Sequence, residues 1–319
     1  MVDRAVASGA DIREPDGHHL ALAIEGGAMR GVVSMGMLVL LEQLGVAESF
    51  DAIYGASAGA INGAFFIARQ ADMAATVYYN EMLNREFIDF RRILVGKPFV
   101  SLDYLLDEVV ENMKPLDWEG VVRSNTALRP IATSLTTFLP VVLPRARSKE
   151  ELKESLRASA RIPGVAGLPV ALGDDRYFDA TLLDSLGFRS ALTSGATHVL
   201  VLRTRSRELE RSAPSRPERL LLERRLRRFD ERLVELYLNR HIAYREELAE
   251  LADLTAATGP PYVLEISPPA KDRPVSQYTR SRDAVFGGAS SGMRAMSEAI
   301  FGVEPRTLDV ITAFYGADK

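Results

Sequence analysis

The sequence predicts an α/β fold, a three-layer sandwich with a mainly parallel central sheet, carrying a long helical insertion. The first observation is an apolar run at residues 19–25 that ends in two glycines and is followed by apolar residues at helical spacing. The second is the same order of strand, glycine-rich turn and helix at residues 50–68. Such an alternation is typical of a parallel sheet covered by helices.

The first two strand–helix units can be bounded from the sequence. In the first, the strand is HLALAIE at residues 19–25, and apolar residues recur at helical spacing over residues 32–44 until Gly45 ends the helix. In the second, the strand covers residues 50–54 and the apolar helix covers residues 60–68.

The central part of the chain is predicted to add further helices and strands. Residues 71–126 are mainly helical, and their clearest amphipathic segment is at residues 103–113. Beyond them we expect a helix at residues 149–158 and strands at residues 128–135, 141–143, 177–179 and 198–202.

Residues 205–259 form an Arg-rich insertion with helical periodicity. Ser215 and Glu218 have the spacing of a capping box with a proline in the first turn, and apolar residues follow at steps of three and four. The pattern ends at a Gly-Pro-Pro sequence beginning at Gly259. The prediction is one helix of about 40 residues, which would be about 60 Å long.

The C-terminal part is expected to complete the core. It contains a predicted strand at residues 262–266 and a last helix at residues 280–301, broken at Gly287 and Gly288. The resulting division is an N-terminal extension at residues 1–18, the core at 19–204, the insertion at 205–259 and the C-terminal strand and helix at 260–319.

Composition excludes several classes of protein. The chain has 319 residues, 47% of them hydrophobic, and a net charge of -4, so it can bury a large core and is not a general nucleic-acid binder. Without cysteine it has no disulfide, thiolate metal site or cysteine nucleophile. No signal peptide is apparent, and the apolar run at residues 32–41 is too short to span a bilayer. We therefore expect a soluble, cytoplasmic protein.

The sequence GASAG places Ser57 between Gly55 and Gly59, where a predicted strand meets a predicted helix. A nucleophile elbow needs small flanking residues there, because the sharp turn must project the serine above the sheet. The helix N-terminus can stabilise negative charge on the nucleophile or on the substrate oxygen. The plain structural alternative is a small-residue helix start packed closely on a strand.

The sequence GGAMRG, from Gly26 to Gly31, also lies between a strand and a helix. Consecutive small residues expose backbone N–H groups that can bind a phosphate or the oxyanion of an acyl-transfer intermediate. The loop lacks the third glycine of a dinucleotide fingerprint and the Lys-Ser/Thr ending of a phosphate loop. An oxyanion hole, one βα unit before the elbow, is the simpler interpretation.

Together with two later segments, these motifs resemble the patatin-like phospholipases. The family pattern is a GGGxRG loop, a GxSxG elbow, an ASxxxPxxFxPV stretch and an Asp-Gly dipeptide. The corresponding sequences here are GGAMRG, GASAG, ASARIPGVAGLPV at residues 158–170, and Asp179 in FDAT. The resemblance covers roughly residues 19–204, with the motifs in the family's order.

The resemblance implies a serine lipid acyl hydrolase with a Ser57–Asp179 dyad, acting on lipid esters or phospholipids without a cofactor. Asp179 would accept the Ser57 proton directly, which requires a separation of about 2.6 to 3.2 Å. The oxyanion hole would come from the Gly26–Gly31 loop and from Ala58. Its backbone donors would be Gly27, Ala28 and Ala58, while Arg30 would either brace the loop or meet a lipid phosphate.

The chain departs from the family pattern at three places. Ala28 replaces the third glycine of the loop, Ala180 replaces the glycine after the aspartate, and the aromatic residue of the PxxFxPV stretch is replaced by a small one. If Ala28 or Ala180 needs a positive φ, alanine costs roughly 1 to 2 kcal/mol there.

A triad with histidine is the competing catalytic arrangement. His198 and His241 follow Asp179, as chain order in α/β hydrolases requires. However, His198 begins a strand without a glycine-rich loop, and His241 lies in the predicted long helix, so we expect neither to be the base. His18 and His19 have no accompanying metal-ligand pattern, and no metal site is expected.

The insertion is locally basic, with eleven arginines against six acidic residues between Arg203 and Arg232. An amphipathic basic helix can contact anionic lipid headgroups at a membrane surface, pack on the core, or form the seam of an oligomer. A solvated helix face with interspersed ion pairs is the interpretation we favour.

Two functions other than hydrolysis are compatible with these motifs. A lipid acyltransferase would use the same acyl-enzyme with an alcohol as acceptor in place of water. A catalytically impaired lipid-binding or membrane-binding protein on the same scaffold would account for Ala28, Ala180 and the basic helix.

Overall fold

A computed structural model describes residues 16–302, which form a mixed sheet of eight strands. The order across the sheet is β5-β6-β3-β2-β1-β7-β8, and β4 pairs with β3. The five strands β3, β2, β1, β7 and β8 are parallel to one another. The strands β4 and β6 pair antiparallel with β3, and β5 pairs antiparallel with β6. The strands are β1 Leu20–Ile24, β2 Ala52–Ala56, β3 Ala127–Ser134, β4 Pro140–Val142, β5 Val170–Leu172, β6 Asp175–Asp179, β7 His198–Leu202 and β8 Tyr262–Ile266.

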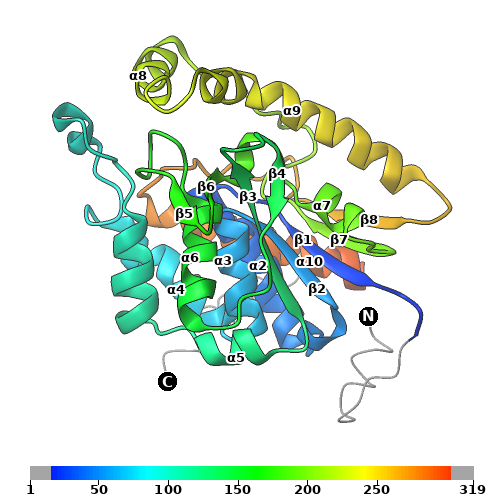
Figure 1. The fold of residues 1–319 in the computed structure, drawn as a ribbon. Coiled ribbons are helices and arrows are strands. Elements are labelled where there is room, and N and C mark those ends of the chain that lie inside the picture. Colours follow the sequence, from blue (N-terminus) through cyan, green and yellow to red (C-terminus); the bar gives the residue numbers. More distant parts are fainter. Residues whose placement is uncertain (1–15, 303–319) are drawn as a thin grey trace.

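Helices cover both faces of this sheet (Figure 1), which confirms the predicted three-layer α/β fold. The α-helices are α2 Val32–Gln43, α3 Ala58–Ile67, α4 Ala71–Tyr79, α5 Trp118–Arg123, α6 Lys149–Ala160, α7 Phe188–Thr193, α8 Arg216–Leu226, α9 Glu231–Ala256 and α10 Arg282–Phe301. Shorter or wider helical turns are η1 Ala28–Gly31, η2 Ala47–Ser49, η3 Glu81–Leu83, η4 Phe90–Val95, η5 Tyr104–Met113 and η6 Ala180–Leu182.

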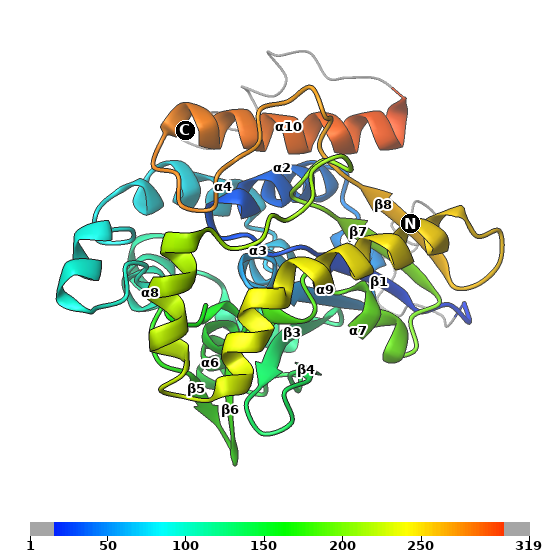
Figure 2. The same ribbon diagram turned by 90° about the horizontal axis from the view of Figure 1, so that it is seen from above.

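Two apolar cores lie on opposite sides of the sheet. The larger core contains apolar side chains of α2, α3, α4, α10 and the start of α9. The smaller core contains those of α7 and of the later part of α9, together with the other face of β1, β2 and β7. Figure 2 shows α2 and α10 on one side of the sheet and α7 and α9 on the other. All residues of β2 are buried, as expected of a central parallel strand.

The carboxyl ends of the parallel strands meet at one edge of the sheet. Ile24 at the end of β1 is paired with Gly55 of β2 and with Leu202 of β7. The GGAMRG loop and GASAG turn follow these strand ends, so both motifs lie at the same edge. Ligands of open α/β sheets usually bind outside this edge.

The prediction of one helix across the insertion is wrong. The structure has two helices, α8 and α9, separated at residues 227–230. The Asp230 side chain accepts a hydrogen bond from the Arg232 N–H at 2.9 Å and thereby starts α9 as a new helix. Beside this break, Phe229 packs edge-on against Phe178 at a centroid distance of 5.7 Å. Tertiary packing thus ends the helix although the apolar periodicity of the sequence continues.

The insertion crosses the carboxyl edge of the sheet (Figure 1) and is anchored by buried polar groups. The Tyr244 hydroxyl of α9 donates to Glu25 Oε1 at 2.9 Å, directly after β1. Glu247, one helical turn later, accepts hydrogen bonds from the Ser185 and Leu186 N–H groups at 3.1 and 3.4 Å. Glu223 of α8 forms ion pairs with Arg219 and with Arg227, which directly follows the helix, as expected of a solvated face.

Glu247→Gln is expected to remove a pH dependence of stability. Burial and the neighbouring Asp184 raise the pKa of Glu247 well above its ordinary value. A carboxyl whose pKa is raised by folding contributes stability that is full below its unfolded pKa and is lost as pH rises through the folded pKa. The wild type should therefore lose up to about 1.4 kcal/mol of unfolding free energy per pH unit in that window, relative to the variant.

Urea denaturation between pH 4 and 8 measures this effect. Glu246→Gln is the matched control, because Glu246 is the exposed neighbour on the same helix. We expect this control to retain the wild-type slope. A Glu247→Gln variant with the same pH profile as the wild type would show that Glu247 is ionised in the folded protein.

The predicted break in the last helix is also wrong, since α10 is continuous over Arg282–Phe301. Its glycines permit close packing. A Cβ at Gly292 would lie 1.9 Å from the Val33 carbonyl oxygen, and one at Gly288 would lie 2.5 Å from Val275 Cγ2. The helix therefore approaches α2 backbone to backbone, which a larger residue would prevent.

Within residues 16–302, no helix is both long enough and apolar enough to cross a bilayer. Most of the predicted N-terminal extension, and the end of the C-terminal part, lie outside the described residues.

Candidate active site

Ser57 occupies the sharp turn between β2 and α3. Its φ of 55° and ψ of -125° are unusual for a residue with a side chain, and such strain costs roughly 1 to 3 kcal/mol. This backbone conformation matches the strained strand-to-helix turn of a nucleophile elbow. The Ser57 N–H donates to Ser159 Oγ at 3.0 Å, which ties the turn to the end of α6.

Two glycines let the surrounding backbone approach Ser57. A Cβ at Gly59 would lie 2.2 Å from the Ile24 carbonyl oxygen, so α3 packs directly on the end of β1. A Cβ at Gly26 would lie 2.8 Å from Ser57 Cβ, so the GGAMRG loop passes directly beside the serine. The GGAMRG loop and the GASAG turn are therefore packed directly against each other.

Asp179 is the last residue of β6 and is completely buried. Its backbone N–H donates to the Arg161 carbonyl at 3.0 Å, and its carbonyl accepts from Thr133 Oγ1 at 2.9 Å. Its side-chain Oδ1 accepts hydrogen bonds from the Thr181 N–H at 2.8 Å and from Thr181 Oγ1 at 2.6 Å. The carboxylate is therefore held by both strand and turn.

Strand register explains why the two predicted dyad residues come together. β3 lies between β2 and β6; Ala56 is paired with Ile131 of β3, and Asp179 with Ala132. Since Ser57 directly follows Ala56, it flanks β3 at the same level as Asp179 on the opposite side.

The carboxyl of Asp179 is within the influence of Ser57. Burial raises the pKa of Asp179 above its ordinary value, and hydrogen bonding from Ser57 and Thr181 lowers it only in part. Among residues 16–302, the buried Oδ2 has no hydrogen-bond partner of ordinary geometry. The Ser57 hydroxyl is therefore near enough to lower the pKa of Asp179, although Oδ2 has no well-aligned donor among these residues.

The two alanines that depart from the family pattern behave differently. Ala28 has a φ of 50°, so the loop does use a left-handed conformation there, at a cost of roughly 1 to 2 kcal/mol. Ala180 is not among the positive-φ residues and begins the short helical turn η6. The alanine after Asp179 therefore introduces no backbone strain.

Three backbone N–H groups were predicted from the sequence as oxyanion donors. Those of Gly27, Ala28 and Ala58 precede or begin helices, where the first N–H groups have no partner within the helix. By contrast, the Gly26 N–H already donates to the Ser185 carbonyl at 3.3 Å, and the Arg30 N–H to the Gly27 carbonyl at 3.1 Å. The donors thus come from both motifs.

The Arg30 side chain braces the loop. It is 6% exposed, and its Nε donates to Thr204 Oγ1 at 3.1 Å. Burial and the nearby Arg205 lower the pKa of Arg30 to about 9, against the opposing effect of Glu25. Of the two roles considered from sequence, this geometry favours bracing.

Gly31 at the end of the loop packs on α3. A Cβ there would lie 2.6 Å from the Tyr78 hydroxyl oxygen and 2.9 Å from Ala58 Cβ. The Gly31 carbonyl accepts from Asn62 Nδ2 at 2.8 Å, and the Tyr78 hydroxyl donates to Asn62 Oδ1 at 2.9 Å. This network holds the loop against the elbow helix.

Ser57 and Ala58 border a narrow apolar cavity. Among its lining side chains only Ser57, Asn62 and Tyr78 carry a hydroxyl or amide group, and those of Asn62 and Tyr78 are paired with each other. The walls are otherwise aliphatic or aromatic, from Phe65, Phe87 and their neighbours. Such a cavity suits a hydrocarbon chain.

Sequence reasoning missed the supporting roles of Ser159 and Thr181. Ser159 accepts the elbow N–H, and Thr181 holds the Asp179 carboxylate through its N–H and hydroxyl. Two features of the sequence could have indicated these roles. Ser159 lies in the ASARIP stretch, and Thr181 places a hydroxyl two residues after Asp179.

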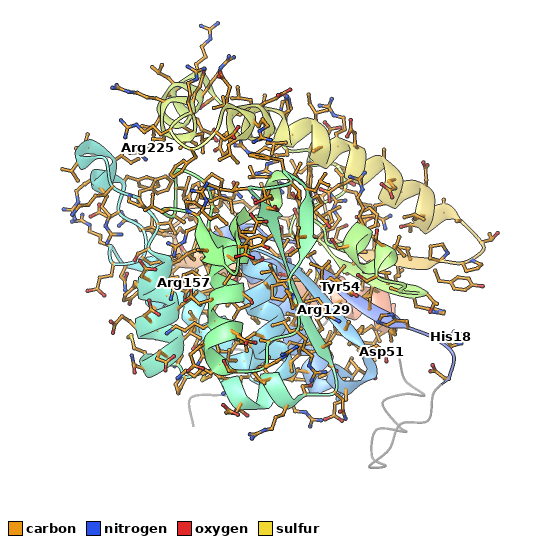
Figure 3. All side chains as sticks on the ribbon, viewed as in Figure 1. His18, Asp51, Tyr54, Arg129, Arg157 and Arg225 are labelled. Carbon is orange, nitrogen blue, oxygen red and sulfur yellow. The ribbon has the colours of Figure 1, made fainter. Side chains whose placement is uncertain are left out.

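The histidines do not complete a triad. His198 begins β7 at the amino edge of the parallel sheet, where its ring stacks on Tyr262 at 4.9 Å. The ring of His18 lies 4.8 Å from that of His198. In Figure 3, His18 is at the opposite end of the molecule from Arg225 of α8. His241 Nδ1 contacts the Leu238 carbonyl within α9. None of these residues borders the cavity that Ser57 lines.

Comparison with known proteins agrees with the geometry. The family model described as patatin-like phospholipase matches residues 22–192, just over half of the chain. An uncharacterised protein of Escherichia coli strain K12, YjjU, is 31% identical over 189 residues, which cover 58% of this chain. The match spans 52% of that relative, about half its length. The chain therefore belongs to the patatin-like phospholipase family.

Proposed function

We propose that this protein hydrolyses the carboxylic esters of lipids through an acyl-enzyme on Ser57, with Asp179 as the base. The observation that carries the proposal is the position of Ser57, on a strained elbow between a buried carboxyl and an apolar cavity. Membership in a lipid hydrolase family supports the same reaction class. No metal or cofactor takes part in the proposed steps.

In acylation, Ser57 Oγ attacks the ester carbonyl carbon while its proton passes to Asp179 Oδ2. The tetrahedral intermediate then breaks its bond to the leaving oxygen, which takes that proton and departs as the alcohol. In deacylation, water attacks the acyl-enzyme, gives a proton to Asp179 and releases the fatty acid, and Ser57 Oγ regains the proton. Because Asp179 Oδ2 has no hydrogen-bond partner among residues 16–302, its lone pairs are available to accept the proton.

The N–H groups of Gly27, Ala28 and Ala58 would stabilise the negative charge on the carbonyl oxygen. The N-terminus of α3 adds a favourable dipole at the same place. In this arrangement the acyl chain enters the apolar cavity, whose dry walls favour hydrocarbon over polar groups.

Burial makes Asp179 a stronger base, because it raises the pKa of the carboxyl above its ordinary value. Hydrogen bonds to Thr181 act in the opposite direction and keep the carboxylate oriented. Since only the ionised carboxylate can accept the Ser57 proton, activity should fall as the solution becomes acidic enough to protonate it.

A fluorophosphonate probe is expected to label the wild-type protein at Ser57, because only an activated serine reacts readily with such an electrophile. Ser57→Ala should abolish labelling without loss of the folded state, measured by gel fluorescence and circular dichroism. Peptide mass spectrometry locates the label. An unlabelled wild type, or labelling that survives in Ser57→Ala, would refute the proposed nucleophile. A separate assay, the release of free fatty acid from a lipid ester by the wild type, tests whether water is the acyl acceptor.

A further inference from the structure

The insertion places an arginine next to the turn that holds Asp179. Arg211 lies in the segment between β7 and α8, and its Nη1 donates to the Thr181 carbonyl at 2.9 Å. Thr181 in turn donates to Asp179 Oδ1 from its N–H at 2.8 Å and from its hydroxyl at 2.6 Å. A single residue, Thr181, therefore links the Arg211 guanidinium to the carboxyl that we propose as the base.

Thr181 is also packed against the other parts of the site. A Cβ at Gly26 would lie 3.0 Å from Thr181 Cγ2 and 2.8 Å from Ser57 Cβ. The Thr181 side chain thus lies beside the GGAMRG loop, on the side of the elbow. Moving this turn would change the position of Asp179 relative to both Ser57 and the loop, so whatever fixes Thr181 also fixes the geometry of the proposed dyad.

Three arginines border a cavity beneath the insertion, and Arg211 differs from the other two in its partners. Among the residues that the structure describes, Arg211 has no carboxylate at ion-pair distance, and its electrostatic attraction is to Asp179. The other two have carboxylates in direct contact. These pairs are Arg205 with Glu25 at 2.8 Å and Arg240 with Glu218 at 2.6 Å.

The positive charge of Arg211 acts in the direction that a base requires. Burial raises the pKa of Asp179, and hydrogen bonds from Ser57 and Thr181 together with the charge of Arg211 oppose this rise. Burial and repulsion from the two paired arginines lower the pKa of Arg211 to about 10, so its guanidinium is still charged at neutral pH. That charge favours the ionised carboxylate, the only form that can accept the serine proton.

The other titratable groups that border this cavity keep their charge where Asp179 titrates. Tyr237 of α9 and Tyr278 before α10 are neutral, because burial raises the pKa of both, that of Tyr278 to about 12. For Glu218 of α8, burial acts to raise the pKa, but the Tyr237 hydroxyl and the charge of its paired arginine lower it below its ordinary value. Titration of these groups therefore does not overlap with that of Asp179.

We propose that Arg211 is a positioning residue of the ester hydrolysis: bound to the Thr181 carbonyl, it orients the turn that holds Asp179, and its charge keeps the Asp179 carboxyl ionised. This inference rests on the proposed function for the role of Asp179 as the base. The charge is what Arg211 alone provides, since Ser185 Oγ also donates to the Thr181 carbonyl, at 3.3 Å. The basic insertion thus contributes directly to the active site.

Carbon-13 NMR of the aspartate carboxyl groups measures the ionisation of Asp179 without turnover, and the signal is assigned by its absence in Asp179→Asn. Arg211→Gln, which keeps a hydrogen-bond donor but no charge, is expected to raise the midpoint of the Asp179 titration by about 0.5 to 1 pH unit. Arg211→Lys, which keeps the charge, should stay close to the wild type. Arg228→Gln is the control for net charge, because Arg228 is exposed after α8 and does not line the cavity.

The pH dependence of kcat/KM for a p-nitrophenyl ester gives a second readout. The acid limb of Arg211→Gln should move to higher pH by the same amount, which makes this variant about three- to tenfold slower than the wild type at a pH below both midpoints. The ratio of the two rates should be closer to one on the alkaline plateau. A change that only loosened the fold would lower the rate equally at every pH.

An Asp179 midpoint that is unchanged in Arg211→Gln, or raised equally in Arg228→Gln, would overturn the inference. If Arg211→Gln melts below the assay temperature, Arg211→Ala takes its place, and failure of both to fold would make Arg211 a structural residue and also overturn it. Hydrolysis by the wild type is measured separately. If no ester is hydrolysed, the proposed function fails, while the NMR titration still decides whether Arg211 controls the ionisation of Asp179.

Discussion

Asp179→Asn is expected to lower kcat for a p-nitrophenyl ester by about 10² to 10⁴-fold, the usual contribution of a general base. Asparagine keeps an oxygen that can accept the Thr181 hydrogen bonds, so the turn after β6 should persist. Its amide cannot take the Ser57 proton. Initial rates at saturating substrate measure the effect, and the melting temperature reports on the fold.

Asp175→Asn is the matched control for this experiment. Asp175 is at the other end of β6, where its carboxylate accepts hydrogen bonds from Ser134 and Thr136. We expect its substitution to leave the rate close to wild type. A fully active Asp179→Asn protein would remove Asp179 from the mechanism, and an equal loss in both variants would indicate a structural effect of the strand.

Gly59→Ala is expected to have the second large effect, a loss of about 1 to 3 kcal/mol of unfolding free energy together with loss of fluorophosphonate labelling. The new Cβ would lie 2.2 Å from the Ile24 carbonyl oxygen and 3.1 Å from that of Glu25. Both contacts are with backbone, which cannot rotate away. The helix α3 must then move off β1, carrying Ser57 with it.

Gly287→Ala is the contrasting substitution. Gly287 lies within α10, and a Cβ there meets no atom within 4 Å. Replacing glycine by alanine at an open helical site stabilises by roughly 0.5 to 1 kcal/mol. Urea denaturation should therefore give shifts of opposite sign for the two variants. Stabilisation by both would mean that α3 is not packed on β1 as described.

Much of the fold could be predicted from the sequence because its signals are local. Short apolar runs gave the bounds of β7 and β8 correctly. The first two strand–helix units were predicted to within two residues by apolar runs that end at glycines. The continuous helix predicted over the insertion failed for the opposite reason. Periodicity records which residues are apolar, but packing of Phe229 on Phe178 and capping by Asp230 decide where the helix ends.

The site was predictable in its parts and not in its assembly. GASAG and GGAMRG each indicate a turn at a strand end, and Asp179 was found through a resemblance of motifs. That Ser57 and Asp179 flank the same level of β3 depends on pairings between strands that lie far apart in the chain. The supporting hydrogen bonds of Ser159 and Thr181 depend on the same pairings.

By itself, the sequence determined the family and the absence of cysteine chemistry, and it predicted a serine nucleophile, because these follow from residue types at short, fixed spacings. Only the tertiary structure decided that Ala28 needs a left-handed backbone while Ala180 does not. It also decided that Arg211, one of eleven arginines in a basic run, donates to the carbonyl of Thr181, two residues after Asp179. The physical reason is that burial and charge pairing depend on elements distant in sequence.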